Sequence, residues 1–136
     1  MPGAATNGPA RRATVWAGRV MSGIVILFLI MDISMKLANL DVVKQAGLPL
    51  GWQPDTARML GTILLACTAL YAYPRTAILG AILLTGYLGG AVATHLRVGD
   101  PYFTHVLFGV YVGILAWGGL WLRDPALQAV FPLRQR

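Results

Sequence analysis

Charged residues are scarce in this chain, and cysteine is nearly absent. Asp, Glu, Lys and Arg together make up 12% of the 136 residues, against 57% that are hydrophobic. This balance is far from that of a soluble globular domain, and the length allows one domain at most. The single cysteine, Cys67, excludes an internal disulfide and a dithiol pair, so any thiol redox cycle would need a second protein. Because Cys67 lies within an apolar run, we expect it to be a small packing residue.

The basic residues do not form the clustered face that nucleic-acid binding needs. The formal net charge is +6, but the Lys and Arg side chains stand singly at the ends of apolar segments, where such residues anchor helices at lipid headgroups. The expected partner is therefore the lipid bilayer, and no nucleic acid is expected.

Four apolar runs occupy most of the chain and leave no room for a soluble catalytic domain. At about 1.5 Å per residue, runs of about 20 residues cross the hydrocarbon core of a bilayer. The predicted helices cover residues 15–37, 56–73, 77–96 and 102–122. The short link at residues 74–76 makes the second and third helices antiparallel neighbours. The predicted fold class is thus an all-α membrane protein, an antiparallel bundle of four transmembrane helices over residues 14–124.

The segments outside these helices are predicted to lie in water or at the interface. Residues 1–13 predict a disordered tail, and residues 41–54 a turn-rich interfacial loop. Asp124 and Pro125 predict the cap and first turn of a short interfacial helix, within a basic tail at residues 125–136. The Arg11–Arg12 pair also matches a cleavable signal peptide, but the long apolar run after it favours a retained helix.

Two spacings of small residues on the third helix predict close packing. Gly86 and Gly90 are four residues apart, and Gly89 and Ala93 repeat the spacing one face over. Such small-x-x-x-small pairs let another helix backbone approach closely.

The arginine distribution predicts the orientation. With four spans, seven arginines lie on the side of the termini and four basic residues lie on the other side. The seven are Arg11, Arg12, Arg19, Arg75, Arg123, Arg134 and Arg136. The four are Lys36, Lys44, Arg58 and Arg97. The positive-inside rule then places both termini in the cytoplasm.

Polar residues from several helices converge on the predicted outer half of the bundle. Asp32 and Lys36 are four residues apart on one helix face, and His95 and His105 flank the same turn. Ionisable residues inside a membrane are functional candidates, so we predict a polar pocket here. The predicted ligand-binding residues are Asp32, Lys36, Tyr87, Thr94, His95, Arg97 and His105. No catalytic residue is assigned.

Metal and haem binding are disfavoured at this site. Zinc takes three or four ligands, and the two histidines with Asp32 or Asp100 form only a minimal set. Haem needs two histidines facing each other across the cofactor, and helices joined by so short a turn are too close for that.

Three strings carry a resemblance to a known family. They are LLACTALYAYPRTAILGAILLTGYLGGAVATH (residues 64–95), RVGDPYFTH (97–105) and WLRDP (121–125). From the first helix to Asp124 the chain resembles the DoxX-like family of small four-helix membrane proteins. The resemblance implies a bacterial cytoplasmic membrane protein with relatives linked to thiosulfate:quinone oxidoreductase and to thiol or oxidative-stress complexes. The recurring polar positions of that family fall here on Asp32, Lys36, His95, Arg97 and His105.

Two functions stay open. The first is a small subunit or accessory of a membrane redox complex, quinone- or thiol-linked, in which histidine and an acid exchange protons with a quinone. If such a protein is an enzyme, it is a quinone-linked oxidoreductase subunit. The second is a non-catalytic membrane assembly or lipophilic small-molecule-binding protein, whose polar cluster fixes packing. Its partners would be other membrane subunits or a second copy of the chain.

Overall fold

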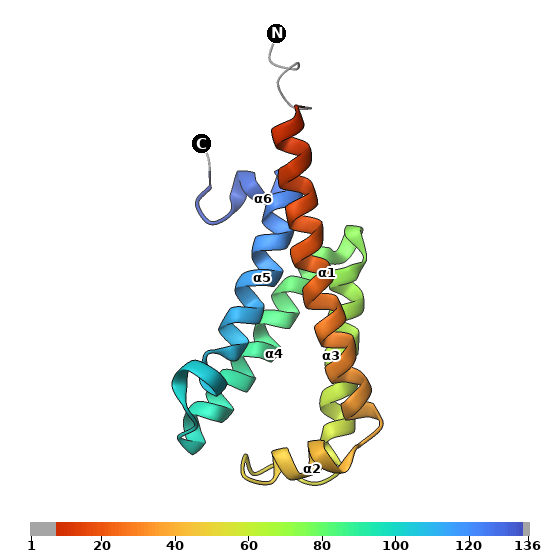
Figure 1. Ribbon diagram of the computed structural model, residues 1–136, viewed down its shortest axis with the longest axis vertical. Coiled ribbons are helices and arrows are strands. Elements are labelled where there is room, and N and C mark those ends of the chain that lie inside the picture. Colours follow the sequence, from red (N-terminus) through yellow and green to blue (C-terminus); the bar gives the residue numbers. More distant parts are fainter. Residues whose placement is uncertain (1–7, 135–136) are drawn as a thin grey trace.

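The computed structural model describes residues 8–134, which form helices and turns without a β-strand (Figure 1). In chain order the elements are α1 (Pro9–Leu37), α2 (Asp41–Gly47), α3 (Thr56–Ala72), the 3₁₀ turn η1 (Pro74–Thr76), α4 (Ala77–Val98), the π-helical turn η2 (Tyr102–Val106), α5 (Phe108–Arg123) and α6 (Pro125–Val130).

Within residues 8–134, three helical segments are long and apolar enough to cross a membrane. They are α1, η1 with α4, and η2 with α5, of 29, 25 and 22 residues. The fourth apolar helix, α3, has 17 residues. At about 1.5 Å per residue, α3 is about 25 Å long, which is shorter than an average hydrocarbon core.

The bundle consists of α1, α3, α4 and α5, and α1 and α4 lie diagonally across it. Both α1 and α4 pack against α3 and α5. We call the end where α1 begins and α5 ends the termini end, and the opposite end, crossed by α2, the α2 end (Figure 1).

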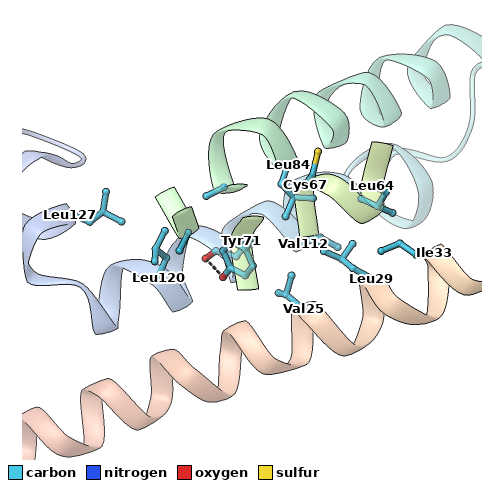
Figure 2. Packing of buried hydrophobic residues seen from close by; sticks show 13 residues of the cluster. Val25, Leu29, Ile33, Leu64, Cys67, Tyr71, Leu84, Val112, Leu120 and Leu127 are labelled. Carbon is cyan, nitrogen blue, oxygen red and sulfur yellow. Dashed lines mark hydrogen bonds between the residues drawn. The ribbon is translucent and has the colours of Figure 1, made fainter. Parts of the chain in front are cut away.

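One apolar cluster joins the four helices (Figure 2). Its members include Leu29 of α1, Leu64 and Tyr71 of α3, Leu84 of α4 and Leu120 of α5, all nearly inaccessible. The outer surface is apolar as well. Leu27 and Phe103 face outward and are 70% and 79% exposed. Such a surface suits lipid acyl chains.

Glycines set the closest helix contacts. A Cβ added at Gly80 of α4 would lie 2.1 Å from the amide nitrogen of Tyr71 in α3. A Cβ at Gly18 of α1 would lie 2.6 Å from the carbonyl oxygen of Gly119 in α5. A larger residue at either position would therefore force the two backbones apart.

The predicted packing role of Gly86 and Gly90 is wrong within this chain. A Cβ at Gly86, Gly89 or Gly90 would meet no atom of a neighbouring helix within 4 Å among residues 8–134. The tight α3–α4 link fixes the rotation of α4 so that Gly80, Ala81 and Leu84 face inward. The face that carries Gly86 and Gly90 then points away from the other three helices.

Two predicted irregular segments contain helix. The first seven residues of the predicted tail lie outside the described residues, but α1 already begins at Pro9, so residues 9–13 are helical. Proline is favoured at a first helical position, because its missing N–H has no helical partner there. Within the predicted interfacial loop, residues 41–47 form α2 before the turns at residues 48–55.

Candidate functional site

Asp32 and Lys36 form an ion pair on the last turns of α1. Their side chains are 31% and 18% exposed. Helix periodicity brings residues four apart onto one face, and the pairing lowers the cost of placing both charges inside a bundle. Lys36 also lies on the α1–α3 contact, since a Cβ at Gly61 would be 2.9 Å from the Cβ of Lys36.

Tyr87 of α4 is partly buried near this ion pair. It packs against the apolar cluster that contains Cys67, and Asp32 is among the charged groups near it. The structure therefore places one predicted residue from α4 on the same side as the predicted pair from α1.

His95 and His105 are brought together at the turn between α4 and η2. Their ring centroids are 5.8 Å apart, with the ring planes at 62°. Gly99 caps α4 with a φ of 78°, in the left-handed region that favours glycine. This cap turns the chain back so that an Asp100 carboxylate oxygen lies 2.6 Å from Nδ1 of His95. Asp100, His95 and His105 thus form one chain of contacts.

His105 differs from the prediction in the direction it faces. Its spacing from Gly109, Val112 and Ala116 predicts an inward position, but the residue is exposed and Val106 is buried instead. Residues 102–106 form a π-helical turn, which holds more residues per turn than an α-helix and so shifts the register before α5 begins.

Two other predicted residues have structural partners of their own. The Thr94 hydroxyl donates to the carbonyl oxygen of Gly90 at 2.8 Å, within its own helix. Arg97 donates to the carbonyl oxygen of Leu50 at 2.9 Å, which ties the turns after α2 to the end of α4. Arg97 therefore links two segments at the α2 end.

The predicted set is thus divided into two groups at the α2 end. One is Asp32 with Lys36 and Tyr87, and the other is His95 with His105, which Asp100 joins from outside the predicted set; Thr94 and Arg97 belong to neither group. Over residues 8–134 no hydrogen bond or ion pair joins the two groups. The same range holds no cluster of three or more His, Cys, Asp or Glu side chains arranged to bind a metal.

The structure contains an apolar groove that the sequence does not predict. It has a volume of about 710 Å³ and runs between α4 and α5 to the segment after α6. Four glycines and three aromatic residues contribute to its lining, namely Gly89, Gly109, Gly113, Gly118, Trp117, Trp121 and Phe131. None of the seven predicted ligand-binding residues lines it.

Aromatic contacts hold the wall of this groove. Trp117 stacks on Phe131 with centroids 5.2 Å apart, and its indole N–H donates to the Thr85 hydroxyl at 2.7 Å. The indole N–H of Trp121 donates to the carbonyl oxygen of Phe131 at 2.8 Å. In the sequence, only the spacing of four residues between Trp117 and Trp121 indicates that the two side chains share a helix face.

A buried hydrogen-bond network joins three helices near the termini end. The Tyr71 hydroxyl of α3 donates to the carbonyl oxygen of Ala116 in α5 at 2.6 Å (Figure 2). It accepts from the Ser22 hydroxyl of α1, 2.8 Å away. Arg123 Nε lies 3.4 Å from the Ser22 oxygen and completes the chain of donors. Every member has a partner, so the network is a structural element.

Comparison with known proteins identifies a family. The model of the DoxX-like family matches residues 20–119. No curated protein and no solved structure matches the chain.

Proposed function

The chain belongs to the DoxX-like family, and from this we propose that it is a four-span protein of the bacterial inner membrane with both termini in the cytoplasm. Helix α3, with 17 residues, is the shortest of the proposed spans. Flanking residues such as Arg58 and Tyr73 can extend to the interfaces, and a bilayer thins locally around a short span. Its antiparallel packing against α4 through η1 supports a complete crossing.

We further propose that the protein is a small accessory subunit of a membrane redox complex and binds a quinone-like headgroup at His95 and His105. The observation that carries this proposal is the contact chain from Asp100 through His95 to His105. An ionised carboxylate only accepts hydrogen bonds, so it fixes the proton of His95 on Nδ1 and leaves Nε2 as an acceptor.

The second histidine complements the first. If the Thr104 hydroxyl donates to Nδ1 of His105, 2.8 Å away, the proton of a neutral His105 ring lies on Nε2. The pair then offers one donor and one acceptor side by side. A quinone carbonyl accepts a hydrogen bond, and the hydroxyl formed on its reduction donates one, so this pair fits both oxidation states. The electrons would come from a partner subunit.

The alternative is a non-catalytic assembly protein. The unoccupied face of Gly86 and Gly90 favours it, because no helix within residues 8–134 approaches there. In that case the His95–Asp100 contact only stabilises the turn between α4 and η2.

One titration separates the two functions. The purified chain in lipid nanodiscs is titrated with a short-chain quinone, and tryptophan fluorescence reports binding. His95→Gln and His105→Gln should each weaken binding about three- to tenfold, the worth of one hydrogen bond, while Asp41→Asn, an exposed charge at the same end, should not. Equal quinone affinity for all variants, with lower thermal stability for His95→Gln, would exclude the quinone site and favour the assembly function.

A further inference from the structure

A second cavity lies at the termini end, opposite the histidines. It has a volume of about 310 Å³ and lies between the first turns of α1, the end of α5 and α6. Arg11 and Thr14 of α1, Arg123 of α5 and Gln128 of α6 supply its polar lining, and Val15 and Leu122 its apolar lining. We call it the arginine cleft.

The two arginines of the cleft have no carboxylate partner in the described part of the chain. Over residues 8–134 the ion pairs within 4.0 Å involve only Lys36, Lys44 and His95 as cations. The nearest acid in sequence, Asp124, accepts the backbone N–H groups of Ala126 and Leu127 as the cap of α6. Asp124 therefore forms no direct ion pair with Arg11 or Arg123.

Arg123 is held in place by the buried network. Its Nε donates to the Ser22 hydroxyl, which the Tyr71 hydroxyl fixes in turn. The terminal nitrogens of its guanidinium bond to no acceptor among residues 8–134. A planar guanidinium with free terminal N–H groups matches the oxygens of a phosphate, and a fixed one loses less conformational entropy on binding.

We propose that the arginine cleft binds the phosphate of an anionic phospholipid. The position favours a lipid over free phosphate, because Arg123 ends a membrane-spanning segment and Val15 and Leu122 face the same cavity. The arginines of the cleft would contact the lipid headgroup, and the adjacent apolar side chains would contact its acyl chains. The net positive charge of the termini end also favours an anionic ligand, because the described residues there include six arginines and one aspartate. They are Arg11, Arg12, Arg19, Arg75, Arg123, Arg134 and Asp124. Basic pockets between helices at a membrane surface are known sites for anionic headgroups.

The test measures lipid retention by the full chain. Native mass spectrometry in detergent, with phosphatidylglycerol or phosphatidylcholine added, should show preferential retention of phosphatidylglycerol. Arg11→Gln and Arg123→Gln should each reduce retention about fivefold, the effect of one basic residue near an anionic lipid surface. The matched control is Arg12→Gln, which removes the same charge from the same turn of α1 but does not line the cleft.

Each outcome decides the proposal. Selective loss in the two cleft variants supports it. An equal loss in Arg12→Gln would show that only net charge matters, and no loss in either cleft variant would exclude the site. Arg123→Gln also removes a contact to Ser22. If that variant unfolds, the result for Arg11→Gln decides the proposal. Displacement of the lipid by millimolar inorganic phosphate, but not by sulfate, would overturn the lipid assignment in favour of free phosphate.

Discussion

Replacement of Gly80 by alanine is the sharpest test of the bundle geometry. The added Cβ would lie 2.1 Å from the backbone nitrogen and 2.5 Å from the Cα of Tyr71, and 2.6 Å from the carbonyl carbon of Leu70. All three are backbone atoms of α3, so no side-chain rotation relieves the overlap. The three-residue turn η1 also prevents α3 and α4 from sliding apart at this point.

The expected magnitude follows from two opposing effects. Overpacking of a tight contact costs about 1–3 kcal/mol, and backbone overlap places Gly80→Ala at the upper end of that range. Alanine in place of glycine inside a helix contributes about 1 kcal/mol in favour of folding. We therefore expect a net loss of about 2 kcal/mol in the free energy of unfolding.

The matched control is Gly90→Ala in the same helix. It makes the same chemical change, but the new Cβ meets no atom within 4 Å. The helix-propensity gain is shared, so the difference between the two variants, about 3 kcal/mol, isolates packing.

Reversible unfolding in mixed micelles by added dodecyl sulfate, followed by tryptophan fluorescence, measures both values. Equal stability of the two variants would refute the α3–α4 contact. Destabilisation by Gly90→Ala alone would restore the packing that the sequence predicts for Gly86 and Gly90.

Two further predictions concern topology and the buried network. In a Cys67→Ala background, Tyr102→Cys should react with an impermeant maleimide on intact cells and Arg75→Cys only after permeabilisation; the reverse pattern would place the termini outside. Tyr71→Phe should lower the free energy of unfolding by about 1 kcal/mol, the scale of interhelical hydrogen bonds in membranes. A double-mutant cycle with Ser22→Ala should show coupling between the two side chains. Independent effects of the two substitutions would mean that the Ser22 contact contributes nothing to stability.

The sequence predicts the position of the helices better than their rotation. Apolar runs bounded by Pro74, Gly99 and Asp124 locate the long helices to within a few residues, apart from the start of α1. Local spacing also predicts that Asp32 pairs with Lys36 and that the two histidines meet at one turn. These relations depend on residues close in sequence, where helix geometry alone decides.

The remainder depends on which face of each helix turns inward. Helices that are apolar on all sides carry no pattern that marks the buried face, so the face of Gly80 could not be told from that of Gly90. The exposure of His105 depends on one π-helical turn. The contact of Ser22 with Tyr71 joins residues 49 positions apart, and neither residue has a local feature that predicts it.

The Tyr71 network also constrains how the chain is assembled during synthesis. When α1 and α3 have entered the membrane, Ser22 is available to Tyr71, but the carbonyl of Ala116 has not yet been made. Each unpaired polar group in the hydrocarbon core costs several kcal/mol, so the early pair is held together by its one shared hydrogen bond. Ala116 then arrives on α5, the last of the long helices, and gives the Tyr71 hydroxyl its acceptor. The final span therefore completes a contact that α1 and α3 can already form, and in a nascent chain stopped before α5 the Tyr71 hydroxyl would have Ser22, but not Ala116, as its partner.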